Sequence, residues 1–88
     1  MASAIPLFRL GRVLEMRGDT GKTKLYGEIK DGAFTPPIKL GGRASVWPEN
    51  EVAALNAAAI AGFTKEQIRA LVKQLLAKRA DLAKQVAA

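Results

Sequence analysis

A group of cationic and hydroxyl side chains between residues 22 and 30 is suited to binding an anionic surface. On a helix that turns by ~100° per residue, Leu25 and Ile29 share one side, and the opposite side is polar and cationic. Lysine neutralises phosphates or reaches guanine edges, threonine contacts a base, and a tyrosine hydroxyl holds a phosphate. Gly27 would leave room for close approach. The residues of this candidate surface are Lys22, Thr23, Lys24, Tyr26, Gly27 and Lys30.

A second cationic group consists of Lys39 and Arg43, which flank Gly41-Gly42. An arginine at such a turn can enter a narrow minor groove or bind a phosphate. The alternative for both groups is that they are the solvated charges of an amphipathic helix and of an exposed turn. We interpret Trp47 as a core residue, because proteins that bind single strands present several aromatic side chains and this chain has only 1 Trp, 1 Tyr and 3 Phe.

The apolar spacing before residue 35 predicts two helices joined by a short turn. The first helix contains Leu10, Val13 and Leu14, the turn covers residues 18–21, and the second helix covers about 21–31. This is a helix-turn-helix, in which the second helix carries the candidate surface.

The ends of the second helix have their own signals. Asp19 or Thr20 is predicted to cap its first turn, because these side chains accept hydrogen bonds from free backbone N–H groups. Gly32 is predicted to end it, because glycine adopts the left-handed conformation readily. Phe34 should then pack back onto Leu25 and the rest of the apolar side.

Residues 38–47 alternate around the Gly41-Gly42 pair, which predicts a small β-hairpin, or wing. Pro48 and the acidic residues after it are typical of a first helical turn, and the apolar spacing continues to Gly62. We therefore expect a mainly α-helical winged helix-turn-helix domain over residues 5–62.

Residues 63–88 are predicted to add one long C-terminal helix, over about 65–86, that begins with a capping box of Thr64 and Gln67. Its apolar stripe is one-sided and is interrupted at Arg79. Two explanations stay open: the stripe enlarges the core of a small domain, or it forms an oligomer contact. The residues predicted for an oligomer contact are Leu71, Leu75 and Leu82.

Composition excludes several classes of protein. The 88 residues contain no His and no Cys, which removes zinc ligands, a neutral-pH proton shuttle and a thiol nucleophile, so we predict no enzyme, no catalytic residues, no metal and no cofactor. The segment from Gly18 ends like a phosphate-binding loop, but Met16 stands where that motif requires glycine. The longest uncharged stretch, 52–64, is too short to span a membrane.

The N-terminal sequence and the net charge predict a cytoplasmic protein that binds nucleic acid. The N-terminus has no basic segment before its short apolar patch, so no secretory signal is expected and the protein should be cytoplasmic and nucleoid-associated. The net charge of +6 with a pI near 10.1 is typical of a small domain that binds nucleic acid.

Taken together, six segments also carry a family pattern. They are Val13-Leu14, 21–26, 29–34, 37–41, Arg43-Ala44 and 47–52. With these motifs the chain resembles the AlpA-like phage and prophage regulators, which are grouped with excisionases and other MerR-type winged helix-turn-helix proteins. The chain differs from the usual family pattern in its turn at 18–21, which in the family is more often one residue shorter with a serine cap, and in the helix after Gly62.

The resemblance implies binding of double-stranded DNA in a regulator or recombination directionality factor of a mobile element. The second helix and the wing near Arg43 would make the contacts, with cooperation between neighbouring copies. An excisionase would bend DNA to assemble a complex with an integrase or other recombinase, and a transcriptional regulator would occupy a promoter. One alternative is an adaptor or anti-repressor that uses the C-terminal helix to bind a protein. Another is an RNA-binding protein, although the chain lacks the stacked aromatic side chains typical of that class.

Overall fold

The computed structural model describes residues 5–87 as four helices and three short strands. Residues 1–4 and residue 88 lie outside the described part. The N-terminal segment for which no secretory signal was predicted begins in residues 1–4. The mainly helical winged helix-turn-helix with an added C-terminal helix is confirmed. The elements are β1 (Leu7–Arg9), α1 (Leu10–Met16), α2 (Lys22–Lys30), β2 (Ile38–Leu40), β3 (Ala44–Pro48), α3 (Glu49–Ile60) and α4 (Lys65–Ala87).

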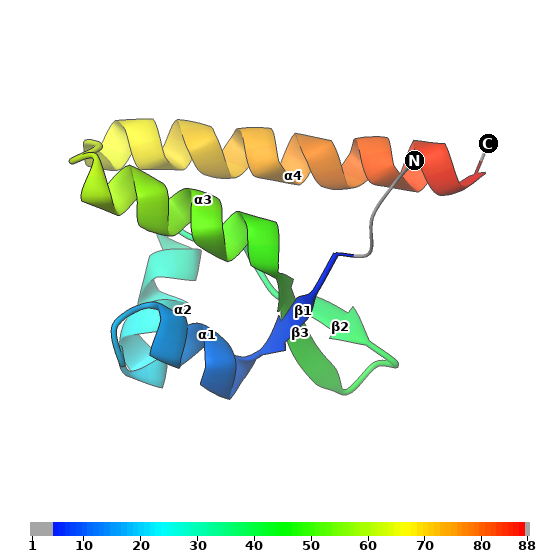
Figure 1. Ribbon diagram of the computed structural model, residues 1–88, viewed down its shortest axis with the longest axis horizontal. Coiled ribbons are helices and arrows are strands. Elements are labelled where there is room, and N and C mark those ends of the chain that lie inside the picture. Colours follow the sequence, from blue (N-terminus) through cyan, green and yellow to red (C-terminus); the bar gives the residue numbers. More distant parts are fainter. Residues whose placement is uncertain (1–4, 88) are drawn as a thin grey trace.

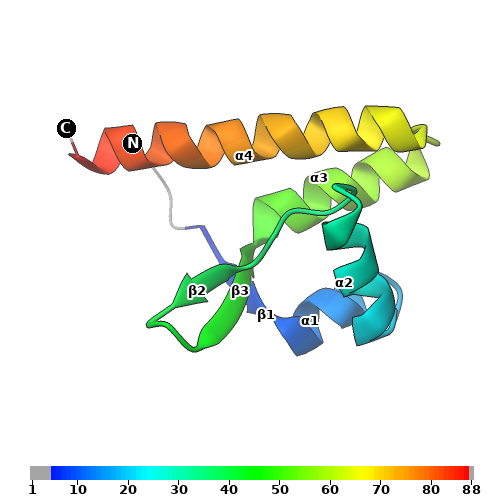
Figure 2. The ribbon, with the colours of Figure 1, turned by 180° about the vertical axis from the view of Figure 1, so that it is seen from behind.

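The helices and the sheet form two layers. Helices α3 and α4 pack against each other along the long axis of the molecule, which extends 37 Å, and α1, α2 and the sheet lie together on one side of this pair (Figure 1). The opposite view shows the segment between α2 and β2 crossing from the helix-turn-helix to the hairpin (Figure 2). Helix α2 and the hairpin therefore lie on the same side of the α3–α4 pair, and the C-terminal end of α2 reaches α4, where Arg69 Nε donates to Asp31 O at 3.0 Å.

The sheet is antiparallel with the order β1-β3-β2. The predicted hairpin of β2 and β3 pairs Lys39 with Ser45, and Gly41 and Gly42 at its turn have φ of 65° and 81°. Strand β1 was not predicted from the sequence, because three residues are too few to show an alternating pattern. It forms because β3 offers a second hydrogen-bonding edge, which places Phe8 opposite Trp47.

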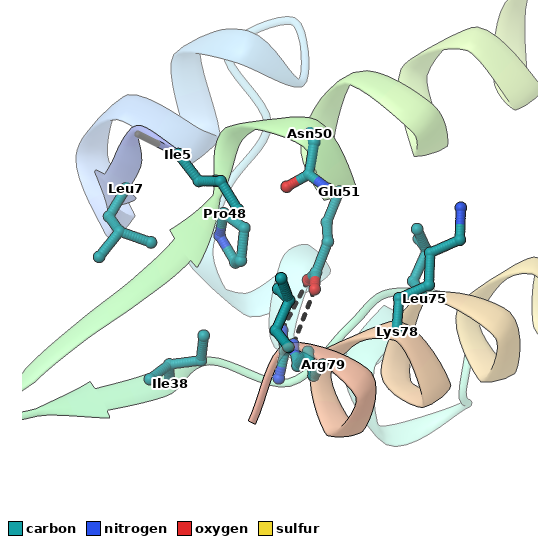
Figure 3. Close-up of a pocket in the computed structure, with 10 residues that line it drawn as sticks. Ile5, Leu7, Ile38, Pro48, Asn50, Glu51, Leu75, Lys78 and Arg79 are labelled. Carbon is teal, nitrogen blue, oxygen red and sulfur yellow. Dashed lines mark hydrogen bonds and ion pairs between the residues drawn. The ribbon is translucent and has the colours of Figure 1, made fainter. Parts of the chain in front are cut away.

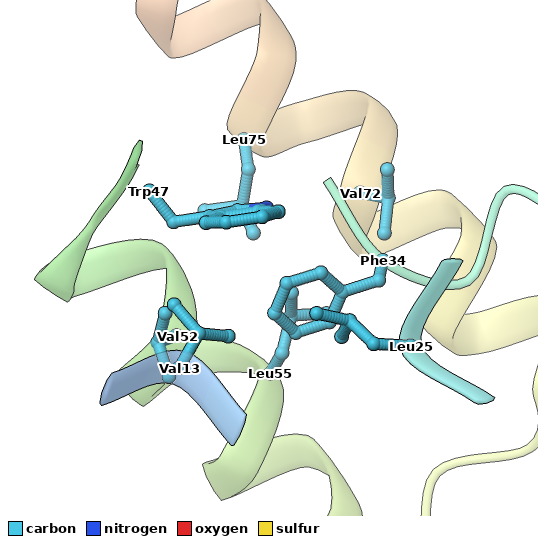
Figure 4. Close-up of a cluster of buried hydrophobic side chains, with 8 residues drawn as sticks. All are labelled: Val13, Leu25, Phe34, Trp47, Val52, Leu55, Val72 and Leu75. Carbon is cyan, nitrogen blue, oxygen red and sulfur yellow. The ribbon is translucent and has the colours of Figure 1, made fainter. Parts of the chain in front are cut away.

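The core joins all the helices to the sheet (Figure 4). Trp47 is fully buried, and its indole Nε1 donates a hydrogen bond of 2.8 Å to the backbone oxygen of Thr35, so its prediction as a core residue is confirmed. Phe34 packs in the same cluster as Leu25, also as predicted. The buried residues of this cluster are Val13, Leu25, Phe34, Trp47, Val52, Leu55, Val72 and Leu75.

The first half of α4 completes this core, because Val72 and Leu75 are buried in it. Farther along, the Arg79 guanidinium donates to both carboxylate oxygens of Glu51, at 2.7 and 2.6 Å, and to the backbone oxygen of Pro36 at 2.9 Å. Glu51 is 3% exposed. The residue that interrupts the apolar stripe therefore fastens α4 to α3 and to the segment after α2.

The predicted signals at the helix ends are confirmed in two places. At α4, the Thr64 N–H donates to the Gln67 side chain and the Gln67 N–H donates to the Thr64 hydroxyl, at 2.8 and 3.1 Å. At the end of α2, Gly32 has φ of 77° and its N–H donates to Ile29 O at 3.1 Å. Both signals act within a few residues, so neighbouring elements did not override them.

The predicted side-chain cap of α2 by Asp19 or Thr20 is wrong. The N-cap is Gly21, which makes no side-chain cap hydrogen bond. The preceding turn instead completes α1: the N–H of Thr20 donates to Leu14 O at 3.2 Å, and Asp19 adopts φ of 57°. Asp19 and Thr20 therefore finish the first helix, and the chain reaches α2 one residue later in an extended conformation.

Candidate nucleic-acid interface

Helix α2 has one buried and one open side, as its sequence predicted. Leu25 is fully buried and Ile29 is half-buried against the core. Five of the six predicted surface residues of α2 are exposed, namely Lys22, Thr23, Lys24, Gly27 and Lys30. A Cβ added at Gly27 would meet no atom within 4 Å, so the backbone is open to a ligand at this point.

Tyr26, the sixth predicted surface residue of α2, is only half-exposed. Its ring packs edge-on against Trp47, with ring centroids 6.5 Å apart and an interplanar angle of 69°. This contact places the ring between the core and the surface. Tyr26 is therefore an anchored residue at the edge of the candidate surface rather than a freely exposed one.

The wing presents its two predicted cations differently. The Lys39 ammonium donates a hydrogen bond of 2.7 Å to the Ser45 hydroxyl across the hairpin, which holds the long side chain against the pairing strand. Arg43 is exposed in the turn between β2 and β3. One cation is thus fixed on the hairpin, and the other lies at its tip.

The structure brings three of the predicted residues together around one hollow of about 440 Å³ between α2 and the wing. Arg9, at the end of β1, lines it as well and was missed by the sequence analysis, because the position of β1 was unknown. Lys24, Lys30 and Arg43 lie outside this hollow, which is lined by Arg9, Leu10, Gly11, Lys22, Tyr26, Lys39, Ala44 and Ser45.

Arg17, at the C-terminal end of α1, contacts both α2 and α3 and was also missed. Its guanidinium donates to Asn56 Oδ1 at 2.8 Å, lies 3.7 Å from a carboxylate oxygen of Glu28, and lies 5.1 Å from the centroid of the Phe34 ring. Asn56 in turn donates to Met16 O at 2.9 Å, at the end of α1. The signal available in the sequence was Asn56 itself, a lone amide in the uncharged stretch of α3.

This arrangement also affects the charge on α2. Glu28 is the acidic residue within α2, and one of its carboxylate oxygens lies 3.7 Å from the Arg17 guanidinium. It follows Lys24 by four positions, so it lies at the flank of the open side. The surface made by α2 and the wing is therefore mainly positively charged, with Glu28 at its edge and paired to Arg17.

The residues predicted for an oligomer contact separate in the structure. Leu75 is buried in the core and Leu71 is half-buried, whereas Leu82 is 39% exposed. Leu82 borders a second hollow, of about 370 Å³, between α4 and the sheet, next to the ion pair of Arg79 and Glu51 (Figure 3). This hollow is mainly apolar and includes exposed Ile5 and Leu7.

Within residues 5–87, no cluster of three or more His, Cys, Asp or Glu side chains is arranged to hold a metal ion. The helices of this part of the chain also include none that is long and apolar enough to cross a membrane.

A family model described as Prophage CP4-57 regulatory protein (AlpA) matches residues 7–54, just over half of the chain. The chain belongs to this AlpA family. The match runs from β1 into α3, so it includes the whole surface of α2 and the wing and leaves out α4. No curated protein and no solved structure gives a match. The AlpA resemblance noted in the sequence is therefore confirmed, and the chain is a phage regulatory protein.

Proposed function

We propose that this AlpA-family protein binds double-stranded DNA in a sequence-specific manner and regulates a mobile element at its attachment site or at a promoter. The observation that carries the proposal is that α2 has an exposed cationic side and shares a hollow with the wing. Both elements lie on the same side of the α3–α4 pair (Figure 1). A recognition helix and a wing on one side match the docking geometry of helix-turn-helix proteins. The protein would then be associated with the nucleoid.

The residues divide by task in this proposal. Thr23, Lys24 and Gly27, on the open side of α2, face base edges in the major groove, where hydroxyl and ammonium groups read donor and acceptor patterns. Lys30 and Arg43 contact phosphates or the adjacent minor groove. In an excisionase role, such contacts on both sides of a groove would favour bent DNA and assembly with an integrase, which would perform the strand exchange.

The first test compares binding to attachment-site and promoter duplexes with binding to a scrambled duplex at two salt concentrations. We expect a preference that persists at the higher salt concentration and that Lys24→Ala/Arg43→Ala removes. Lys73→Ala, an exposed lysine of α4, is the matched control and should bind like the wild type. Equal binding to every duplex that disappears with salt would contradict sequence-specific recognition.

We further propose that neighbouring copies associate head to tail on DNA. The apolar hollow next to Leu82 is lined by the first turn of α3 and by residues of α4 between Leu75 and Leu82. Ile60, which is 88% exposed, is the last residue of α3, and exposed Phe63 follows it in the turn before α4, so both lie at the opposite end of α3. Contacts between unlike ends produce open chains rather than closed dimers. Copies joined along the 37 Å axis would repeat at nearly one turn of DNA, about 34–36 Å.

Cooperativity on a duplex with two adjacent sites tests this association. Leu82→Glu and Ile60→Glu should each remove cooperativity and leave single-site affinity unchanged, and a mixture of the two variants should recover one contact. Loss from Leu82→Glu alone would instead indicate a symmetric contact of α4. If both variants bind DNA normally but no longer regulate the mobile element in cells, the adaptor function through α4 is favoured.

A further inference from the structure

We propose that the hollow between α2 and the wing is a seat for one phosphate group, and that the phosphate belongs to the DNA strand that passes between them. This inference rests on the proposed DNA binding and adds a defined anion site to it. Arg9, Lys22 and Lys39 reach the hollow from β1, α2 and β2, respectively. Three cations from three separate elements make the site depend on the tertiary fold.

The lining favours an anion with several acceptor oxygens. Arginine offers a planar set of N–H donors and lysine offers three N–H bonds, which suits the oxygens of a phosphate. The ammonium of Lys39 is already oriented by its 2.7 Å hydrogen bond to Ser45, which also lines the hollow. No Asp or Glu side chain is among the lining residues, so no carboxylate in the hollow repels an entering anion.

The start of α2 gives an independent reason for an anion at this place. Lys22 is the first residue of this nine-residue helix, and among residues 5–87 no side chain caps the helix at Gly21. The first N–H groups of a helix lack intrahelical acceptors and carry its partial positive charge. An oxyanion in the hollow would lie near this helix end and supply the acceptor that Asp19 or Thr20 does not supply.

The position of the hollow identifies the source of the phosphate. A helix in the major groove and a wing at the neighbouring minor groove are separated by one sugar–phosphate strand. The hollow lies between these two elements and therefore faces that strand. A phosphate held there would fix the register of α2 along the groove, so the side chains of its open face would meet defined base pairs.

Duplexes with one neutral methylphosphonate linkage at successive positions test the seat. At one position, the neutral linkage should weaken wild-type binding by about tenfold, the loss expected for a charge-assisted contact. The same linkage should have less than a twofold effect on Arg9→Gln/Lys22→Gln/Lys39→Gln. The triple variant should also have a shallower salt dependence than Lys73→Gln, its matched control, by about 1 in the slope of log K against log salt concentration.

The outcomes separate the seat from the DNA-binding proposal. If every methylphosphonate affects the triple variant and the wild type equally while Lys24→Ala/Arg43→Ala still loses specific binding, the phosphate seat is wrong and DNA recognition stands. If none of the variants changes binding and no duplex is preferred, both proposals are wrong. Melting curves of the triple variant verify that these three exposed substitutions leave the fold intact.

A second arm distinguishes a free phosphate from the DNA backbone. Inorganic phosphate and pyrophosphate are titrated into the protein without DNA, and amide shifts of Lys22 and Ser45 are followed by NMR. Weak millimolar binding that the triple variant loses would agree with a seat designed for a backbone phosphate. Tight micromolar binding of pyrophosphate, without any position-specific methylphosphonate effect, would overturn the assignment to DNA.

Discussion

Removal of the Arg79 side chain should destabilise the protein strongly, although Arg79 lies outside the α2 surface. In Arg79→Ala, the Glu51 carboxylate loses both of its short contacts, at 2.7 and 2.6 Å, while 3% of the residue is exposed to water. Breaking a buried ion pair from one side reduces stability by ~3–5 kcal/mol. Because the Arg79 side chain keeps 21% exposure, we expect the lower end, about 3 kcal/mol.

The assay is urea and thermal unfolding followed by circular dichroism. A loss of about 3 kcal/mol corresponds to a melting temperature lower by roughly 12–24 °C, at ~4–8 °C per kcal/mol for a domain of this size. Lys73→Ala, an exposed lysine of the same helix, is the matched control and should change stability by less than ~0.5 kcal/mol.

The physical cause can be separated from simple loss of packing. Glu51→Leu/Arg79→Met replaces both charges by apolar groups of similar volume, which is often neutral for a buried pair. We therefore expect the double variant to be more stable than Arg79→Ala. If Arg79→Ala unfolds like Lys73→Ala, or if the double variant is as unstable as the single one, the argument from an unpaired buried carboxylate is refuted.

Three further predictions concern single positions. Gly27→Ala should stabilise α2 by about 0.5–1 kcal/mol, because the added methyl group meets nothing within 4 Å. Gly27→Gln should weaken DNA binding. If a titration finds the same DNA affinity for the wild type and both variants, Gly27 is not part of the interface. Thr64→Ala should lower the free energy of unfolding by about 1 kcal/mol through loss of the hydroxyl that accepts from Gln67, and an unchanged urea midpoint would contradict it. Trp47→Phe should destabilise by about 2–3 kcal/mol, because it shrinks a fully buried ring and leaves Thr35 O without its 2.8 Å donor; calorimetry that finds wild-type stability would show that the site adapts.

The sequence was sufficient where the signal was local. The two-sided pattern of α2, the glycines of the wing and the Thr64 capping box were all predicted correctly. These features depend on side-chain spacing or backbone conformation within three or four residues. The exposure of the predicted lysines on α2 followed from the same pattern, because the apolar positions fix which side turns to the core.

The cap of α2 shows where even local reasoning failed. Asp19 and Thr20 have suitable side chains, but the free carbonyls at the end of α1 compete for the same short turn. The backbone N–H of Thr20 bonds to Leu14 O, and Gly21 becomes the N-cap. The free carbonyls at the end of α1 and the free N–H groups at the start of α2 are separated by only five residues. One short turn does not supply partners to both, and the residue types in the turn do not predict which helix end receives them.

What the sequence determined by itself was the order of the four helices and the hairpin, and the side of α2 that is buried, since these depend on neighbours along the chain. Only the tertiary structure decided which distant groups meet: Arg79 reaches Glu51 28 positions away, and Arg17 reaches Asn56 39 positions away. The gathering of Arg9 with the cations of α2 and the wing has the same origin. Charged side chains have long flexible stems and many possible partners, so their pairing is settled by the packing of the apolar core and not by their spacing in the sequence.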